Sequence, residues 1–375
     1  MPVGTLKNTL YGLALPVLGK RCEWKAENHV ERVLHRHHAV GACIQRFEKG
    51  KLTDCYSVGF AALGKEKSAA KPDTVFRTAS VAKMVTALLV FRLQTLGEVS
   101  VQEDISDFLG YKVRNPHCPN APITLGMLLS HTSSMVDSNA YFASFQQPVA
   151  LQELLGGDGA FLPTVPGTVF RYSNLAAGMI GCLLEKRFHQ SFEGLAQKLL
   201  FEPLGVKATF DLSKADAART ADSYRVLPAS CGFHAQSRIA AAKELDAPDP
   251  EHHYLLASGS LFLTAPDLAK LTLAAWNGAD GFLNAESIAQ MQTPLLGWPQ
   301  KEVCMQHGMG LFKLEDQAVC SRPLWGHQGF AYGAVNGVFF DKEGNGFACL
   351  NSGASEQRLG HLALLNRDLI RLWFA

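Results

Sequence analysis

The sequence lacks an excess of charge of either sign. Its 375 residues include 35 lysines and arginines against 34 aspartates and glutamates, a formal net charge of +1. Proteins that bind nucleic acids or membrane surfaces usually carry a basic patch or stripe. The balance therefore argues against a nucleic-acid partner and against a membrane partner. The hydrophobic fraction of 47% is ordinary for a globular protein with a sizeable core.

The chain also lacks an apolar run that is long enough to cross a bilayer. The apolar stretch 10–18 follows Lys7 and has a faint similarity to a secretion signal. Its positive region is a single residue, Lys20-Arg21 follows directly, and a clean small-x-small cleavage site is missing. We therefore interpret residues 1–25 as a packed N-terminal extension.

Motifs for disulfide frameworks and metal sites are missing too. The nine cysteines are odd in number, none forms a C-x-x-C pair, and several lie inside apolar runs. This usage predicts buried free thiols in a reducing compartment, and hence a cytoplasmic protein. The histidine clusters at 35–38 and 252–253 lack a ligand spacing such as H-E-x-x-H, so we interpret them as solvated and expect no metal. Nothing implies a nucleotide or flavin cofactor, and the absence of G-x-S-x-G argues against an α/β-hydrolase.

What the chain does have is a serine and a lysine three residues apart. Ser80 and Lys83 stand in front of the apolar run 84–91, which is typical of a buried helix. A serine hydroxyl is a poor nucleophile at neutral pH and needs a nearby base. Positions three apart share a helix face, so this spacing places the Lys83 amine beside the Ser80 hydroxyl. The helix N-terminus also supplies a partial positive charge and unpaired N–H groups for a developing oxyanion.

S-x-x-K is short enough to occur by chance, and the chain holds a second copy. Ser68 and Lys71 match the same pattern, but Pro72 follows and no helical run does. Proline biases the residue before it away from helix, so we interpret this copy as a loop.

Strand patterns lie at both ends of the chain and helical patterns lie between them. The first hairpin is expected from strands 39–47 and 55–63, and the second from 333–340 and 347–351. Helices are expected over 26–38, from Ser80 to near Gly97, over 175–186 and over 356–374. The simplest packing joins the terminal strands into one antiparallel sheet covered by the terminal helices, with a helical lobe from the middle of the chain.

Two further short motifs occur once each. Tyr172-Ser173-Asn174 is the single Y-x-N, and His327-Gln328-Gly329 is the single H-x-G. Each has a plain structural interpretation, because Tyr172 fits a half-buried core position and His327 fits a strand edge beside a glycine bulge.

Together, in the order S-x-x-K, Y-x-N, H-x-G, the motifs resemble those of the penicillin-recognising serine hydrolases. This superfamily includes class C β-lactamases, DD-peptidases, D-aminopeptidases and the family VIII esterases. The resemblance covers nearly the whole chain. Its other landmarks are the segments 75–83, 123–125, 128–133, 201–205, 257–262, 264–268 and 307–311.

The resemblance implies the α+β fold of β-lactamases and DD-peptidases, with an antiparallel sheet flanked by helices plus an all-helical lobe. We expect residues 26–75 and 255–375 to form the α/β sandwich domain. Residues 76–254 would form the mainly helical domain, and the active site would lie between the two.

The resemblance also implies catalytic roles. Ser80 would be the acyl-accepting nucleophile, and Lys83 and Tyr172 would share its proton. The pKa of a tyrosine is ordinarily near 10, so Tyr172 needs a neighbouring cation to act as a base, and Lys83 is the obvious candidate. Asn174 would orient Lys83 and the amide or ester of the substrate.

The same resemblance implies how the substrate is held. The backbone N–H groups of Ser80 and Phe330 would form the oxyanion hole, where removing one donor costs roughly 3–4 kcal/mol. Gly329 would let the strand edge approach the substrate without a side chain.

Three positions depart from the family pattern. His327 stands where true β-lactamases of this class carry the lysine of K-T-G, and a histidine is only partly charged at neutral pH. Efficient β-lactam hydrolysis is therefore less expected, whereas H-x-G resembles D-peptidases and some esterases. Ser134 replaces the usual glycine after His-Thr-Ser. Bulky Phe330 replaces a small residue and either narrows the acyl pocket or points away.

The sequence thus predicts a serine acyl hydrolase that works through an acyl-Ser80 intermediate. Its substrate would be a small carboxylic ester or a D-amino-acid-containing peptide or amide, with slow β-lactam turnover third. The alternative is a non-catalytic binder of D-peptides or cell-wall fragments, against which the three intact motifs argue. The oligomeric state is left open.

Overall fold

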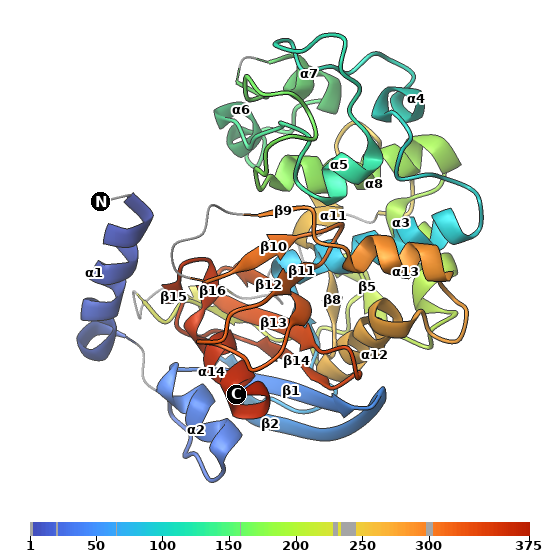
Figure 1. Ribbon diagram of the computed structural model, residues 1–375. Coiled ribbons are helices and arrows are strands. Elements are labelled where there is room, and N and C mark those ends of the chain that lie inside the picture. Colours follow the sequence, from blue (N-terminus) through green and yellow to red (C-terminus); the bar gives the residue numbers. More distant parts are fainter. Residues whose placement is uncertain are drawn as a thin grey trace.

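The structure, a computed structural model, describes residues 3–19, 22–64, 66–157, 159–227, 232–233, 245–297 and 303–375. Its centre is one antiparallel sheet (Figure 1), and every pair of neighbouring strands in it is antiparallel. Within the described residues the order across the sheet is β3 (Lys67–Ala69), β2 (Lys51–Leu63), β1 (Gly41–Glu48), β14 (Gly346–Asn351), β13 (Ala334–Phe340), β12 (Leu324–Ala331), β11 (Phe312–Leu314), β10 (Met305–His307) and β9 (Leu296–Gly297).

The two ends of the chain meet in the middle of this sheet. Strand β1 pairs with β14, with Ile44 opposite Cys349, although some 300 residues separate them. The predicted joining of the two terminal hairpins into one antiparallel sheet is therefore confirmed. The alternation of apolar residues along both hairpins directs one set of side chains to each face of the sheet, so each face needs a cover of helices.

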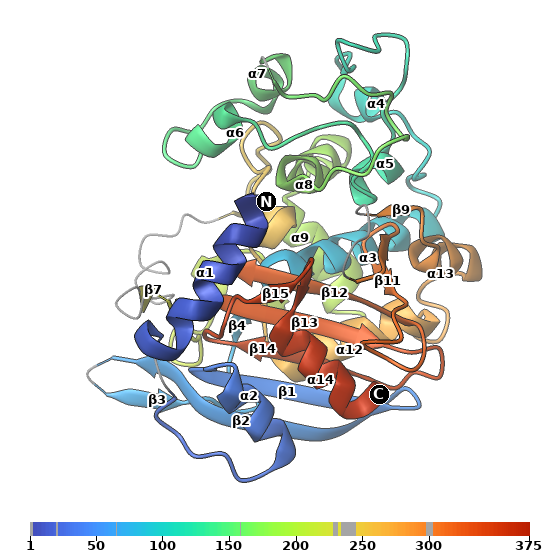
Figure 2. The same cartoon turned by 60° about the vertical axis from the view of Figure 1, so that its left-hand side comes forward.

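Helices cover both faces. Figure 2 shows α2 (His29–Arg36) and α14 (Leu364–Phe374) on one face, where Leu34 and Leu369 pack with Phe339 and Phe347 in one buried cluster. The other face carries α3 (Ala82–Thr95) and α12 (Ala265–Asn277), which belong to the larger cluster.

The other helices and short strands of the described residues have the following bounds. The helical lobe above the sheet in Figure 1 contains α4 (Ile105–Leu109), α5 (Leu125–Leu129), α6 (Asn139–Ala143), α7 (Leu151–Gly156) and α8 (Asn174–Phe188). The remaining helices are α1 (Val3–Leu18), α9 (Phe192–Ala196), α11 (Leu256–Gly259), α13 (Ala285–Gln292) and the turns η1 (Ala79–Val81), η2 (Gln197–Phe201) and η3 (Leu212–Lys214). The remaining strands are β4 (Phe76–Arg77), β5 (Ala208–Thr209), β6 (Ser223–Tyr224), β7 (Gly232–Phe233), β8 (Phe262–Leu263), β15 (Arg358–Leu359) and β16 (Leu362–Ala363).

The prediction of one helix over 356–374 is wrong in its first half. Helix α14 begins only at Leu364, and the residues before it form the small hairpin β15–β16, with Leu359 opposite Leu362. Gly360 turns this hairpin with a φ of +57°, a left-handed backbone that glycine adopts without steric cost. The segment just before the turn is thereby kept extended.

The prediction that the histidine clusters are solvated is wrong for two of their members. His37 is 5% exposed, and its Nε2 lies 2.8 Å from Oδ2 of Asp368. The Nδ1 of His253 lies 2.8 Å from Oε1 of the buried Glu185. Both partners come from distant parts of the sequence, so local spacing gave no indication of them.

The cysteine prediction is confirmed in part. Among the described residues the cysteines are free thiols, and Cys43, Cys182, Cys320 and Cys349 are buried. Cys55 is exposed, contrary to the prediction, and Cys231 lies outside the described residues. In the described ranges we find no group of three or more histidine, cysteine or acidic residues arranged to hold a metal ion. No helix in the same ranges is long and apolar enough to cross a membrane.

Candidate active site

The proposed nucleophile lies in a tight turn that leads into the central helix. Ser80 is the middle residue of the 3-10 turn η1, and α3 begins directly after it at Ala82. Ala79 has a φ of +53°, which is uncommon for a residue with a Cβ. The backbone therefore bends sharply just before Ser80, and the serine precedes the α-helix instead of lying within it. The second S-x-x-K copy is different, because Ser68 is exposed in strand β3. The interpretation of this copy as a loop is therefore wrong for Ser68, although the segment is not helical, as the proline predicted.

Lys83 lies in the first turn of α3 and points at the serine. Its Nζ lies 3.1 Å from Oγ of Ser80, 3.0 Å from Oδ1 of Asn174 and 2.6 Å from the carbonyl oxygen of Ser258. A neutral amine has two N–H groups and one lone pair. The two carbonyl-type oxygens can only accept, so they take both N–H groups. The lone pair is then left for the Ser80 hydroxyl, which can donate.

The buried position of Lys83 makes that neutral amine accessible near neutral pH. The side chain is 4% exposed, and burial lowers its pKa from 10.5 to about 7. The Asp137 carboxylate opposes this change by raising the pKa, and the Arg77 guanidinium lowers it further. At pH 7 the protonated and neutral forms are therefore present in comparable amounts.

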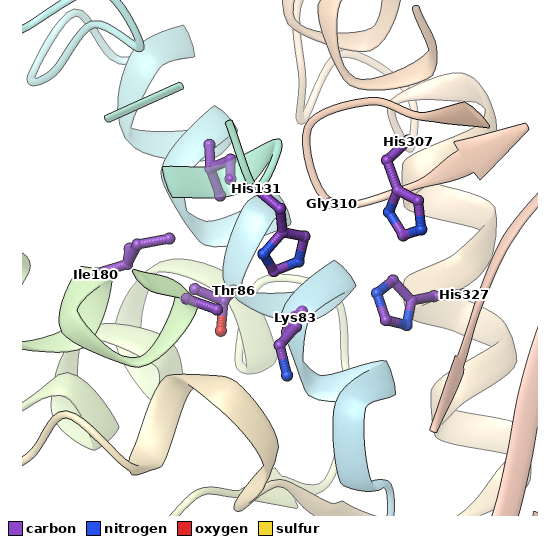
Figure 3. A pocket seen from close by; sticks show the side chains of 9 residues that line it. Lys83, Thr86, His131, Ile180, His307, Gly310 and His327 are labelled. Carbon is purple, nitrogen blue, oxygen red and sulfur yellow. The ribbon is translucent and has the colours of Figure 1, made fainter. Parts of the chain in front are cut away.

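Three histidines surround Lys83 on its inner side. Figure 3 shows His131, His307 and His327 around a small space that the Lys83 side chain also lines. The space measures about 10 Å³, roughly the room for one water molecule. Burial lowers the pKa of all three rings, that of His327 to about 3, with the Lys83 charge adding to the effect for His131 and His327. The histidines are therefore neutral at pH 7.

His327 is accordingly less charged than the sequence predicted. Its Nδ1 lies 2.8 Å from the carbonyl oxygen of Gln328. A carbonyl only accepts, so we assign the ring proton to Nδ1. The expectation of a partly charged His327 is replaced by that of a neutral ring, because desolvation dominates in this 3% exposed position.

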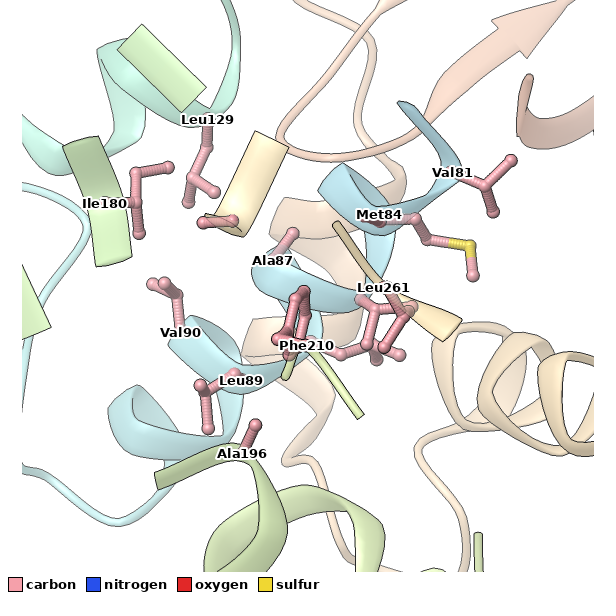
Figure 4. Packing of buried hydrophobic residues seen from close by; sticks show 14 of the residues in the cluster. Val81, Met84, Ala87, Leu89, Val90, Leu129, Ile180, Ala196, Phe210 and Leu261 are labelled. Carbon is pink, nitrogen blue, oxygen red and sulfur yellow. The ribbon is translucent and has the colours of Figure 1, made fainter. Parts of the chain in front are cut away.

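The central helix holds Lys83 by being buried on all sides, as the apolar run 84–91 predicted. Figure 4 shows Ala87 and Val90 of α3 packed among side chains from several elements, including Leu129 and Ile180 of the helical lobe. A Cβ on Gly310 would lie only 2.2 Å from that of Ala87, so the neighbouring loop packs directly on the helix. A helix fixed by such packing gives a lysine in its first turn little freedom to move.

Tyr172 stands on the other side of the serine. Its ring centroid lies 5.1 Å from Nζ of Lys83 and 4.2 Å from the ring centroid of His131. Burial raises its pKa above 10, and a hydrogen bond with Ser80 and the charge of Arg358 act in the opposite direction. Lys83, the neighbour that the sequence predicted, lies beside the ring, yet burial outweighs every influence that lowers the pKa of Tyr172. Tyr172 is therefore a neutral phenol at pH 7 and suits the role of proton donor.

Asp137 is a site residue that sequence reasoning missed. It accepts hydrogen bonds at 2.9 Å from Oγ of Ser173, at 2.8 Å from Nδ2 of Asn174 and at 3.0 Å from the backbone N–H of Leu175. It thus caps α8 and fixes the Asn174 amide, whose Oδ1 faces Lys83. Its partners lie 36 to 38 residues away, so no local motif marked it.

Gly329 brings strand β12 against the nucleophile turn. A Cβ at this position would lie 2.5 Å from the carbonyl oxygen of Thr78 and 2.9 Å from the backbone nitrogen of Ser80. Both are backbone atoms, which cannot turn aside as a flexible side chain can. The glycine therefore places the backbone around Phe330 and the Ser80 N–H on the same side of the site, as an oxyanion hole requires.

A substitution at Gly329 tests this close approach. We expect Gly329→Ala to slow labelling of Ser80 by a fluorophosphonate by about tenfold or more, because the added Cβ would lie only 2.5 Å from a backbone oxygen and the turn must shift away from the strand. Gly156→Ala on α7 is a control for the effect of a methyl group, because no described atom lies within 4 Å of the added Cβ and the backbone of Gly156 is not left-handed. Comparable labelling of both variants, with both still folded, would remove the close approach from the mechanism.

The residues of the three motifs meet at one cleft. Its volume is about 260 Å³, and its lining includes Ser80, Tyr172, Asn174, His327 and Phe330. Lys83 lies behind it, against the smaller internal space. The sequence left open whether the Phe330 side chain narrows the pocket or points away from it. Phe330 lines the cleft, and the Arg358 guanidinium lies 3.7 Å above the centroid of its ring. Bulky Phe330 therefore narrows the cleft.

Ser134, which departs from the family pattern, has a left-handed backbone. Its φ is +65°, the left-handed conformation that the usual glycine would adopt freely. Its Oγ accepts a hydrogen bond at 2.9 Å from Nδ2 of Asn115. This hydrogen bond stabilises the left-handed backbone at Ser134, which a residue with a Cβ adopts less readily than glycine.

A family model described as Beta-lactamase matches residues 26–368. The chain belongs to the beta-lactamase family. The predicted family is therefore confirmed, and by this membership the protein is a serine hydrolase.

Two relatives illustrate the range of this family. Penicillin-binding protein 4 of Amycolatopsis lactamdurans is 27% identical over 317 residues, which cover 79% of this chain and 76% of that protein. The D-alanyl-D-alanine-carboxypeptidase/endopeptidase AmpH of Escherichia coli (strain K12) is 24% identical over 225 residues, or 59% of this chain and 54% of AmpH.

Solved structures of low sequence identity share the fold. EstCE1, a hydrolase with promiscuous acyltransferase activity, has a TM-score of 0.72 at 21% identity and covers 91% of this chain and 97% of its own. The D-amino acid amidase from Ochrobactrum anthropi SV3, complexed with L-phenylalanine amide, has a TM-score of 0.70 at 21% identity. The match covers 92% of this chain and 96% of the amidase chain. The predicted β-lactamase/DD-peptidase fold is confirmed.

Proposed function

We propose that this member of the beta-lactamase family hydrolyses a small ester or amide through an acyl-Ser80 intermediate. The observation that carries the proposal is the placement of Lys83. Its two N–H groups have fixed acceptors in Asn174 and Ser258, so the lone pair of the neutral amine faces the Ser80 hydroxyl.

In the first half of the reaction, Oγ of Ser80 attacks the substrate carbonyl carbon and its proton passes to Nζ of Lys83. The negative charge that develops on the carbonyl oxygen is stabilised by the backbone N–H groups of Ser80 and Phe330. When the tetrahedral intermediate collapses, the leaving group takes a proton from the Tyr172 phenol. The Lys83 ammonium then returns a proton to Tyr172.

In the second half, water replaces the leaving group. Neutral Lys83 accepts a proton from the water through Tyr172 or directly, and the hydroxide attacks the acyl carbon. Collapse of the second tetrahedral intermediate releases the acid and returns the proton to Oγ of Ser80. The enzyme is then restored with Lys83 neutral and Tyr172 protonated.

The substrate class follows from the cleft. A volume of about 260 Å³ narrowed by Phe330 suits a small acyl group. The neutral His327 provides no charge for a β-lactam carboxylate, so we place β-lactam turnover behind ester and D-amino-acid amide hydrolysis. Relatives described as a hydrolase with acyltransferase activity, a D-amino acid amidase and a D-alanyl-D-alanine-carboxypeptidase support this range.

The test is covalent labelling with a fluorophosphonate probe, followed by intact mass measurement and peptide mapping. We expect one adduct on the peptide that contains Ser80. Turnover of phenyl acetate against N-acetyl-D-alanine amide then separates the ester from the amide. Folded protein without an adduct at Ser80 would refute the acyl-enzyme proposal and favour a non-catalytic binder of D-peptides or cell-wall fragments.

Asp137 gives a prediction about pH. Its negative charge raises the pKa of Lys83, so Asp137→Asn is expected to lower that pKa further. Because only the neutral amine accepts the Ser80 proton, the acid limb of the kcat/KM profile for phenyl acetate should move to lower pH. Asp107→Asn is the control, since Asp107 is exposed on α4. A move of the limb to higher pH would contradict the electrostatic role of Asp137.

A further inference from the structure

Two cysteines lie side by side across the first hairpin. Strands β1 and β2 run next to each other in the lower part of Figure 1, with Cys43 opposite Ser57 and Cys55 opposite Gln45. Alternate residues of a strand point to the same face of the sheet, so Cys43 and Cys55 are diagonal neighbours on one face. Their Sγ atoms are 3.6 Å apart. The hairpin therefore brings together two thiols that are 12 residues apart in the chain.

The gap between the two sulfur atoms is small enough for a side chain to close. A disulfide bond is about 2.05 Å long, so Sγ of one cysteine must approach the other by about 1.5 Å. The Cys55 side chain is exposed and can rotate about its Cα–Cβ bond without displacing packed neighbours. Cys43 is fully buried in the core and stays in place.

One member of the pair is open to small molecules and the other is not. Residues 51–55 of β2 are exposed, and among the described residues β3 pairs with β2 only from Phe60 onwards. A small molecule can therefore reach Cys55 from the outer side of β2. Cys43 belongs to the buried cluster that also contains residues of α12, so solvent does not reach it.

The contact between the two thiols also makes them unequal in acidity. A hydrogen bond with the Cys43 thiol lowers the pKa of Cys55 to about 7. The same hydrogen bond, followed by burial, raises the pKa of Cys43. A thiolate is the nucleophile in thiol chemistry, and near pH 7 about half of the Cys55 side chains are thiolates. The exposed cysteine is thus also the reactive one.

We propose that Cys55 and Cys43 form a thiol–disulfide exchange site, in which Cys55 attacks a small disulfide such as oxidised glutathione and Cys43 then closes an intramolecular disulfide with it. The site lies on the first hairpin and uses no step of the reaction at Ser80. It therefore goes beyond the proposed hydrolase function and does not depend on it.

The exchange has two steps. In the first, Sγ of Cys55 attacks one sulfur of the small disulfide, the bond between the two small sulfurs breaks, and the released small thiolate takes up the proton that Cys55 lost. Cys55 is then no longer a thiolate, so the largest cause of the raised Cys43 pKa is removed. The Ser57 hydroxyl donates a hydrogen bond to Sγ of Cys43 at 3.4 Å, which stabilises a thiolate there.

In the second step, Sγ of Cys43 attacks Sγ of Cys55. The mixed disulfide breaks, and the second small thiolate leaves with the proton of Cys43. Overall, the two cysteine thiols are oxidised to one disulfide, and one small disulfide is reduced to two small thiols.

Peptide mapping tests the proposal. The full-length protein is incubated with excess oxidised glutathione, alkylated with N-ethylmaleimide and digested with trypsin. Cleavage after Arg46 and Lys51 places the two cysteines in the separate peptides 37–46 and 52–65. We expect a disulfide to join these two peptides and dithiothreitol to separate them. Alkylation of both peptides, or glutathione retained on either one, would overturn the proposal.

Variants separate the roles of the two thiols. Cys43→Ala keeps a small apolar side chain in the core and removes the second thiol, so glutathione should remain on peptide 52–65. Cys55→Ser removes the attacking thiol, so Cys43 should take up no glutathione while the protein is folded. Glutathione on Cys43 in folded Cys55→Ser would overturn the order of the two steps.

Cys22 provides a matched control within the same chain. It is half-buried, its thiol donates to the carbonyl oxygen of Ala39 at 3.2 Å, and burial raises its pKa to about 12. Iodoacetamide at pH 7 should therefore alkylate Cys55 about tenfold or more faster than Cys22. Cys22→Ser should still form the disulfide between Cys43 and Cys55. Equal alkylation rates of Cys22 and Cys55 in the folded protein would overturn the role of Cys55 as the attacking thiol.

Discussion

Replacing Ser80 with alanine is expected to abolish labelling by a fluorophosphonate and to lower the rate of ester hydrolysis by about 10⁴-fold or more. The residues around the serine act as a unit. In the proposed mechanism Lys83, whose Nζ lies 3.1 Å from Oγ, accepts the proton of that atom, and the backbone N–H of Ser80 stabilises the oxyanion that its attack forms. Without Oγ no acyl bond forms, and the remaining groups assist only a direct attack by water.

The chain provides a matched control for this variant. Ser68→Ala changes the serine of the second S-x-x-K copy, which is exposed on edge strand β3. We expect it to keep full labelling and turnover, with both variants melting near the temperature of the unmodified protein. Labelling that persists in Ser80→Ala and disappears in Ser68→Ala would assign the nucleophile to the other copy.

Site residues that lie close together in the sequence were predictable from it. Ser80 and Lys83 are three residues apart, so the first turns of a helical segment are enough to bring them together. The positions of Tyr172, Asn174 and His327 were given by motif order and family resemblance, and the structure places them at one cleft. Physical reasoning from spacing alone would not have joined segments that lie so far apart in the chain.

Asp137 and Arg358 were not predictable in this way. Each is fixed by partners that come from another element, Asp137 by the N-terminus of α8 and Arg358 by Asn8 of α1. The error at the C-terminal helix has the same origin. Leu359 and Leu362 fit a helical pattern, yet the turn at Gly360 pairs them across a hairpin. Tertiary contacts there outweigh a local periodicity.

Charge states were the least predictable property. The sequence identified His327 and Tyr172 but gave each its ordinary titration behaviour, modified by one neighbour. In the structure burial is the largest cause of each pKa change, since it lowers that of His327 and raises that of Tyr172. Burial depends on the whole fold, so a spacing argument cannot supply it.

The second large effect is expected at Lys83. Lys83→Met should lower kcat/KM for phenyl acetate by about 10²–10⁴-fold, the usual contribution of a general base. Lys83→Arg should be comparably impaired, because a guanidinium keeps the positive charge and cannot accept a proton near pH 7. Lys71→Met, which changes the exposed lysine of the second S-x-x-K copy, is the matched control and should have full activity.

The pH profile identifies the protonation state that works. The pKa of Lys83 is about 7, lowered from 10.5 by burial. In the proposed mechanism the neutral amine is the form that accepts the Ser80 proton. kcat/KM of the unmodified enzyme should therefore rise about tenfold per pH unit below 7 and level off above it. The rise should vanish from the residual activity of Lys83→Met. A profile that falls as pH increases through 7 would mean that the ammonium form is active, and Tyr172 would then have to be the base.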